Sequence, residues 1–249
     1  MTAIGRKVAR LEQRLTRPNA SLAELEAVVA LAMEHDCAAV TVNPWLVKAA
    51  KRSLGRSRLR LGTLIGSPSG TQILAVKAFE ASKALEQGAN QIDFVLNGGA
   101  LLSGDDEIVF NDMLAVVDMA HSALAVAGVV VEAEPMTADQ VSRACRIAER
   151  AGADYVITSG GDLAARKAVQ RTALLRDSVG PRVEVKASGR FRTLADVRAA
   201  AAAGATRVSA EFSAELLAAV AARATEADPV PESISPSSRR PRAIASRAS

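Results

Sequence analysis

Short segments rich in β-branched residues alternate along the chain with longer segments rich in Ala, Leu, Glu and Arg. The short segments have the length and composition of buried strands, and the longer ones have those of helices. Strands are predicted at 38–42, 60–66, 91–96, 129–134, 154–159, 183–188 and 206–210, with a weaker candidate at 9–15. Helices are predicted at 21–35, 71–87, 105–126, 137–151, 162–178 and 193–203. This alternation predicts a parallel sheet covered by helices.

Three of the predicted helices end in the same way, with a glycine immediately before a strand. The segments are "EQGAN" at 86–90, "ERAGAD" at 149–154 and "AAAGAT" at 201–206. Glycine is favoured just beyond a helix C-terminus, so the recurrence indicates one βα unit used repeatedly. Eight such units in roughly 220 residues fit a single (β/α)₈ TIM barrel with parallel strands. An open doubly wound sheet is the alternative, but no Gly-x-Gly-x-x-Gly follows the first strand.

Composition and charge narrow the class of protein further. We assign residues 1–225 to the barrel and predict that the Pro/Ser/Arg-rich segment 226–249 is a disordered tail. Residues 227–249 of that tail supply two of the four net positive charges, so the barrel has too little excess charge to predict nucleic-acid binding. No apolar run approaches the ~18 residues of a membrane span. Two cysteines and two histidines predict a cytoplasmic protein without a disulfide framework, a metal site or a cofactor.

The strand "VEVKASGR" at 183–190 carries charged residues on one face. The more apolar face of a barrel strand should meet the helices, which places Glu184, Lys186 and Ser188 in the interior. The same parity places further side chains there: Gln91, Asp93, Val95, Asn97, Glu132, Glu134, Tyr155, Ile157 and Ser159. Buried charges need partners, so Lys186 should meet Asp93, Glu132 or Glu184. It is then either a catalytic amine or only their counter-ion.

Several longer segments closely resemble the deoxyribose-phosphate aldolase family. They include "GTLIGSPSG", "GANQIDFVLNGGALLSGDDE", "VVVEAEPMT", "YVITSGG" and "VEVKASGR", and the resemblance runs from about residue 9 to 214. That family consists of class I aldolases on a (β/α)₈ barrel, so the resemblance implies a carbon–carbon lyase with a small-molecule substrate. Lys186 matches the family's second lysine and Asp93 its proton-relay aspartate, and Glu132 belongs to the same matching series. Glu12 stands where the family usually has an aspartate.

The chain departs from the family at its two most important sites. Ile157 stands where family members carry the lysine that forms the Schiff base, so the usual covalent intermediate cannot form there. The glycine and serine positions of the phosphate site have become Arg190 and Glu211. We expect these two side chains to pair and to close the phosphate end of the cavity. The resemblance implies substrate contacts at Thr158, Ser159, Ser188, Gly189, Arg190 and Glu211.

Three interpretations remain open from the sequence. The first is a diverged aldolase-type lyase acting on a small carbonyl or hydroxy compound, in which Lys186, Asp93 and Glu132 are catalytic. Ordinary deoxyribose-5-phosphate cleavage would then be absent or weak. The second is a non-catalytic or regulatory homologue, a pseudoenzyme. The third is a barrel isomerase or dehydratase that uses Lys186 and Asp93 for proton transfer. Under each of them the chain could assemble as a homo-oligomer.

Overall fold

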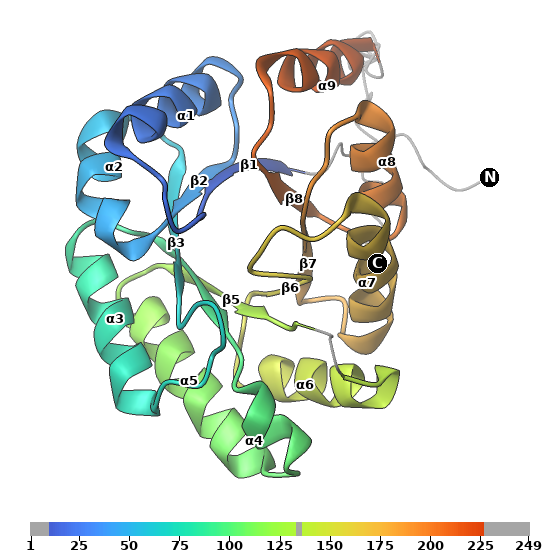
Figure 1. Ribbon diagram of the computed structural model, residues 1–249. Coiled ribbons are helices and arrows are strands. Elements are labelled where there is room, and N and C mark those ends of the chain that lie inside the picture. Colours follow the sequence, from blue (N-terminus) through green and yellow to red (C-terminus); the bar gives the residue numbers. More distant parts are fainter. Residues whose placement is uncertain (1–9, 133–135, 227–249) are drawn as a thin grey trace, which may run out of the picture.

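Eight parallel strands close into a barrel in the computed structural model, which describes residues 10–132 and 136–226 (Figure 1). The strands follow one another around the barrel in chain order, and β8 pairs with β1. They are β1 (Arg10–Leu15), β2 (Ala39–Val42), β3 (Arg60–Ile65), β4 (Gln91–Val95), β5 (Val126–Val130), β6 (Tyr155–Ile157), β7 (Glu184–Ser188) and β8 (Arg207–Ala210). The predicted (β/α)₈ TIM barrel is therefore confirmed, and the weak candidate at 9–15 is a full strand.

Helices surround the barrel, as Figure 1 shows. Those that match predicted segments are α1 (Leu22–Glu34), α3 (Leu74–Glu86), α5 (Asp106–Ser122), α6 (Ala138–Arg150), α7 (Ala165–Ser178) and α8 (Leu194–Ala202). Four further segments, which the sequence pattern did not single out, are η1 (Pro44–Leu46), α2 (Val47–Leu54), α4 (Gly98–Leu102) and α9 (Ala214–Glu226). Apart from Glu226, which ends α9, the predicted tail at 226–249 lies outside the described residues.

Local signals explain where several helices begin and end. Capping boxes start α1, α6 and α8, where Ser21, Thr137 and Thr193 each accept a hydrogen bond from the first helical turn. Gly88, Gly152 and Gly204 follow α3, α6 and α8 with φ angles of 104°, 85° and 101°. Because this left-handed region favours glycine, the predicted glycine punctuation is confirmed.

Strand β5 lies earlier than predicted, at Val126–Val130 instead of 129–134. The pattern missed its start because Ala127 and Gly128 have little strand propensity. Gly128 is required by packing, since a Cβ atom there would lie 2.0 Å from the Tyr155 ring. Glu132 consequently follows the strand, and Glu134 lies outside the described residues.

The apolar core lies mainly between the strands and the helices. A second, smaller apolar cluster lies inside the barrel and consists of Leu64, Val95, Val130, Tyr155 and Ile157, with Val126 packed against it. The rest of the interior is polar, which is the feature that positions the site described next. Among the described helices, none combines the length and the apolarity that crossing a bilayer would require.

Candidate functional site

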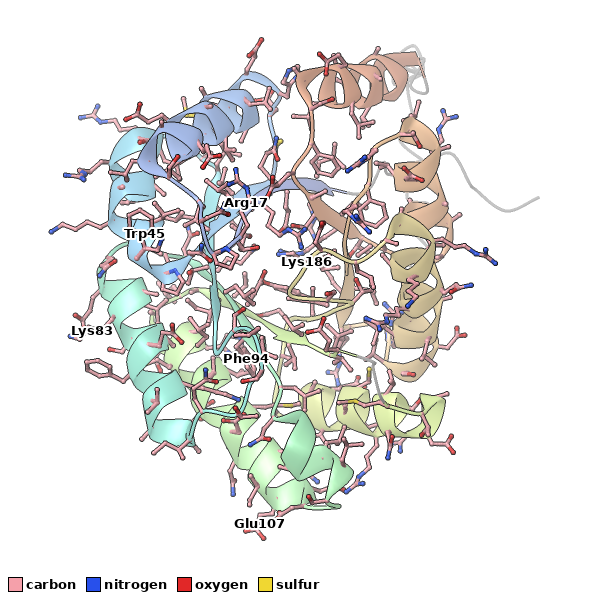
Figure 2. All side chains as sticks on the ribbon, in the orientation of Figure 1. Arg17, Trp45, Lys83, Phe94, Glu107 and Lys186 are labelled. Atoms are coloured by element: carbon pink, nitrogen blue, oxygen red, sulfur yellow. The ribbon has the colours of Figure 1, made fainter. Side chains whose placement is uncertain are left out.

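Lys186 occupies the centre of the barrel, where Figure 2 labels it. It belongs to β7, and only 1% of its surface is exposed. Its Nζ lies 2.6 Å from Oδ2 of Asp93 on β4 and 2.6 Å from Oε2 of Glu12 on β1. The lysine is therefore clamped between two carboxylates from strands on different sides of the barrel.

The electrostatics of this triad keep the lysine charged. Burial opposes the ammonium, but the carboxylates of Asp93 and Glu12 outweigh it, so the pKa of Lys186 is raised. Burial likewise opposes the charge of Glu12, but Lys186 and Arg207 outweigh it, so the pKa of Glu12 is lowered. An amine nucleophile needs its neutral form, whereas this environment favours the ammonium.

A wider polar network surrounds the triad. The Tyr155 hydroxyl donates to Oδ1 of Asp93 at 2.5 Å, and burial together with that carboxylate raises the pKa of Tyr155. Arg207 on β8 donates to Glu12, Gln91 and Glu184 at 3.2, 3.1 and 2.7 Å. The interior parity predicted for Gln91, Asp93, Tyr155 and Lys186 is thus what the structure shows.

Two carboxylates expected near Lys186 pair elsewhere. Glu184 binds Arg207 and Arg10, at the end of the barrel where the strands begin. Glu132 accepts a hydrogen bond from Oγ of Ser159 at 2.8 Å, above the triad. Of the three partners that the sequence suggested for Lys186, only Asp93 contacts it. The second carboxylate in contact with the lysine is Glu12, which the sequence did not suggest as a partner.

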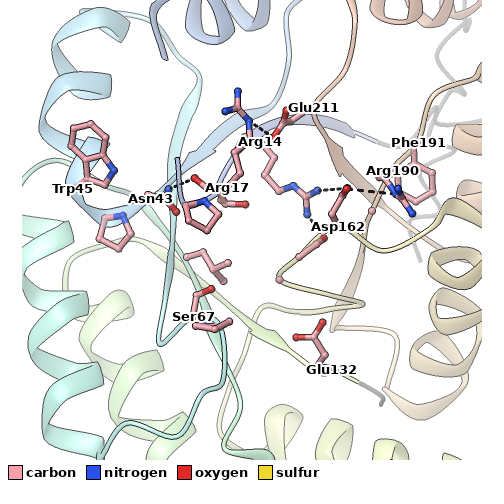
Figure 3. A pocket seen from close by; sticks show the side chains of 18 of the residues that line it. Arg14, Arg17, Asn43, Trp45, Ser67, Glu132, Asp162, Arg190, Phe191 and Glu211 are labelled. Atoms are coloured by element: carbon pink, nitrogen blue, oxygen red, sulfur yellow. Dashed lines mark hydrogen bonds and ion pairs between the residues drawn. The ribbon is translucent and has the colours of Figure 1, made fainter. Parts of the chain in front are cut away.

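The space above the triad is divided into two unequal cavities. A pocket of about 990 Å³ opens at the carboxyl ends of the strands, where barrel enzymes carry their active sites (Figure 3). A void of about 10 Å³ adjoins Lys186, Asp93 and Ile157, and it is barely large enough for one water molecule. Lys186 lines the void and is not among the residues that line the large pocket.

Arg14 lies between the two cavities and lines both of them. It is 7% exposed, and its Nη1 donates to Oγ of Ser188 at 2.9 Å and to the carbonyl of Gly161 at 2.6 Å. Its Nη2 lies 3.7 Å from Asp162. Burial lowers the pKa of Arg14, yet a guanidinium stays protonated in proteins, so it presents a fixed positive charge at the base of the large pocket.

The prediction that Arg190 and Glu211 form an ion pair is wrong, because each of these side chains has a different partner. Nε of Arg190 lies 3.6 Å from Asp162, and Glu211 lies 3.5 Å from Nε of Arg17 (Figure 3). The reason is the closed barrel, which gives the loop after β8 a second neighbour, the loop after β1. All four side chains line the large pocket, so Arg190 and Glu211 remain at its rim.

The remaining candidate residues have varied surroundings. Thr158 is buried and bonds both backbone groups of Ser188, donating to its carbonyl and accepting from its N–H, so it ties β6 to β7. Gly189 lines the large pocket, and Ser159 lines the small void. Ile157 is the cross-strand neighbour of Lys186, so an apolar side chain fills the position beside the amine.

The described residues contain no group of three or more His, Cys, Asp and Glu side chains arranged to hold a metal ion. Cys37 and Cys145 are buried, and burial raises their pKa values to about 11 and about 12, which leaves both thiols unreactive at neutral pH.

The sequence reasoning missed Arg14 and Arg207. Both follow from strand parity once β1 and β8 are placed, because Arg14 is two residues beyond Glu12 and Arg207 is two residues before Ser209. Arg14 was missed because the first strand has only a weak apolar pattern, so its interior side chains were not assigned.

A closed parallel barrel with a charged pocket at the strand carboxyl ends is the architecture of a barrel enzyme. The family model for DeoC/LacD family aldolases matches residues 6–205. The chain is 40% identical over 200 residues to the deoxyribose-phosphate aldolase of Streptococcus gordonii, covering 80% of this chain and 90% of that protein. It is 37% identical over 203 residues to the deoxyribose-phosphate aldolase of Clostridium perfringens, covering 82% and 90%.

A solved relative agrees in fold. The tetrameric deoxyribose phosphate aldolase from Aeropyrum pernix superposes with a TM-score of 0.73 at 29% identity, covering 85% of this chain and 90% of that one. The chain therefore belongs to the DeoC/LacD aldolase family. This family membership supports an aldolase-type lyase.

Proposed function

We propose that this chain is a diverged carbon–carbon lyase that cleaves a small hydroxy-carbonyl compound without forming an imine. Family membership supports the reaction class. Ile157 and the clamped Lys186 argue against the imine route, so ordinary deoxyribose-5-phosphate cleavage is expected to be absent or weak.

The observation that carries the proposal is the presence of Arg14 and Glu132 in one pocket (Figure 3). Arg14 offers an immobilised cation whose Nε and Nη2 have no hydrogen-bond acceptor among the described residues. Glu132 has one hydrogen-bond donor, Ser159, and no cationic partner in the described part of the chain. When a fixed cation and an unpaired carboxylate line the same partly enclosed pocket, the cation can polarise a carbonyl group and the carboxylate can accept a proton.

The cleavage balances with these two groups. Glu132 takes the proton from the β-hydroxyl, and the electrons of that O–H bond form the new aldehyde carbonyl. The Cα–Cβ bond breaks, and its electrons move onto the substrate carbonyl as an enolate that the Arg14 guanidinium stabilises. Glu132 then returns the proton to the enolate carbon, which releases the second product and restores the carboxylate.

A non-catalytic homologue is the second candidate, favoured by the enclosure of Lys186 under Arg14. In that case the triad of Lys186, Asp93 and Glu12 serves only as an internal strut. The same enclosure argues against an isomerase or dehydratase that uses Lys186 and Asp93, since a substrate would not reach them.

The test combines turnover with chemical trapping. The purified protein is assayed for aldehyde release from the aldol adducts of acetaldehyde with acetone and of glycolaldehyde with acetone, with and without borohydride. We expect turnover, no borohydride-trapped adduct, and a loss of about 100-fold or more in Glu132→Gln and Arg14→Gln. Arg14→Lys, which keeps the charge, should fold and retain more activity than Arg14→Gln.

Matched controls lie on distant exposed positions, Glu107→Gln on α5 and Arg56→Gln after α2, and they should match the wild type. A borohydride-trapped adduct on Lys186 would establish the imine route instead. Turnover that is undetectable with both adducts, and with the adduct of benzaldehyde and acetone, would favour the non-catalytic candidate.

Assembly and location complete the proposal. A relative from Aeropyrum pernix is tetrameric, which supports a homo-oligomer here and is checked by sedimentation. We place the protein in the cytoplasm on its scarcity of cysteines, and we expect a small molecule as its partner, without nucleic acid or membrane.

A further inference from the structure

The large pocket has two walls of different chemistry. Pro18, Pro44, Trp45 and Pro68 form an apolar wall, contributed by the loops after β1, β2 and β3. The opposite wall carries charged side chains from the loops after β6, β7 and β8: Asp162, Arg190, Arg192 and Glu211. Figure 3 shows Trp45 and Arg190 on opposite sides, with Arg14 and Glu132 between them.

Trp45 is the only tryptophan of the chain, and 57% of its surface is exposed. The neighbouring Leu46 and Val47 are fully buried, so the turn that carries the tryptophan is anchored. Asn43 also donates to the carbonyl of Arg17 at 2.9 Å, which ties this turn to the loop after β1. A large aromatic side chain held at a pocket rim by a fixed backbone binds flat rings at little entropic cost.

The size of the pocket agrees with a ligand that reaches this wall. At about 990 Å³ it lies at the upper end of the range for drug-sized ligands, so it has room for a ring in addition to a hydroxy-carbonyl portion. An anionic group would gain nothing against three prolines and a tryptophan, whereas a ring would bury apolar surface there.

We propose that the substrate carries an aromatic ring that lies against Trp45, while its hydroxy-carbonyl portion reaches Arg14 and Glu132. This inference rests on the proposed lyase function for the reacting portion only. The specificity-determining residue is Trp45, and the ligand class is an aryl-substituted β-hydroxy ketone.

The test compares ligands that differ only in the ring. The aldol adduct of benzaldehyde with acetone is the probe, and the adduct of cyclohexanecarbaldehyde with acetone is its saturated match. Because Trp45 is the sole tryptophan, intrinsic fluorescence reports occupancy, and calorimetry gives the affinity where the tryptophan is replaced. We expect a saturable fluorescence change and about threefold to tenfold tighter binding of the phenyl compound.

Variants distinguish recognition of the ring by Trp45 from nonspecific hydrophobic binding. Trp45→Leu should abolish the preference for the phenyl compound, and Trp45→Phe should keep most of it. Phe79→Ala removes another exposed aromatic, on α3 and outside the pocket lining, and should change nothing.

Three results would overturn the inference: equal affinity for the two compounds, a phenyl preference that survives in Trp45→Leu, or tryptophan fluorescence that depends on protein concentration and not on ligand. The last would assign Trp45 to a contact between copies of the chain. Failure of the lyase proposal can be told apart from failure of this inference. If the phenyl compound binds at Trp45 but is not turned over, ring recognition by Trp45 stands and only the proposed lyase reaction is refuted.

Discussion

Ile157 and Lys186 are direct neighbours across the β6–β7 pairing, inside the barrel and below Arg14. Ile157 packs with Leu64, Val95, Val130 and Tyr155, and we propose that this hydrocarbon side chain fills the position at which the family forms its imine. The surviving lysine is held as an ammonium by two carboxylates. We propose that loss of the nucleophile and enclosure of its neighbour are two aspects of one rearrangement.

This relationship predicts how the wild-type chain behaves with deoxyribose-5-phosphate. Turnover should fall below the usual enzymatic range of ~1–10³ s⁻¹, and borohydride should trap no adduct, since the described residues that line the large pocket include no lysine. The Streptococcus gordonii relative, assayed in parallel, is the positive control. Turnover within that range would refute the prediction.

Restoring a lysine at position 157 should not by itself restore the imine. In Ile157→Lys the new amine would open only onto the void of about 10 Å³ beneath Arg14. Adding Arg14→Ala should join this void to the large pocket and allow a borohydride-trapped adduct. Peptide mass mapping checks the site of trapping, thermal unfolding checks that both variants fold, and Ile108→Lys on the exposed face of α5 controls for nonspecific amines. An adduct in the single variant would show that Arg14 does not limit access.

Removing the central ammonium should destabilise the fold. Lys186→Met leaves the carboxylates of Glu12 and Asp93 buried without their shared cation, which should lower the free energy of unfolding by about 3–5 kcal/mol. Lys83→Met removes an exposed pair with Glu86 and should cost less than about 1 kcal/mol. Urea denaturation measures both, and equal effects would contradict the strut role.

Stability should depend on acid through Glu12. Its pKa is lower in the folded chain than the unfolded value of about 4.3, so its contribution is fully present above that pH. The contribution is lost as the pH falls through the folded value. The stability difference between the wild type and Glu12→Gln should therefore shrink on acidification, whereas Glu107→Gln should show no such trend. Denaturation curves at several pH values between neutral and acidic provide the measurement.

Packing around Tyr155 predicts a sharp requirement for glycine on β5. Gly128→Ala places a Cβ atom 2.0 Å from the ring, which should cost about 1–3 kcal/mol or more as the ring shifts away from Asp93. Gly99→Ala is the matched control, because its Cβ would meet no atom nearer than 3.5 Å. Thermal unfolding distinguishes the two variants, and similar melting temperatures would show that the ring moves freely.

The alternation of the strands made most of the barrel interior predictable. Period-two parity placed Asp93, Tyr155 and Lys186 inside, because a barrel strand has only two faces. Parity gives no distances across the barrel, so it could not choose Glu12 over Glu132 as the second partner of Lys186. Which carboxylate contacts Lys186 depends on its level along the barrel axis, and Glu132 lies beyond the end of β5.

The contacts between loop residues could not be predicted from the sequence for a different reason. Arg190 and Glu211 are opposite in charge, but their pairing depends on which neighbouring loop lies closer. Asp162 and Arg17 were available on the other sides. Arg14 was overlooked because the first strand has a weak apolar pattern, with "RLEQRL" carrying three charged residues in six.

The position of Arg14 also has a pharmacological consequence. Arg14 contacts Ser188 where, one layer below, Glu12 contacts Lys186. Successive interior residues of a strand are about 6–7 Å apart. A ligand that stops at Arg14 therefore enters this barrel about 6–7 Å less deeply than one that reaches the layer of Lys186. A warhead designed to react with a deep lysine in a related aldolase should stop at the guanidinium in this chain. Inhibitors of that kind are therefore expected to spare it, and compounds that stop at the shallower level could be made selective for it.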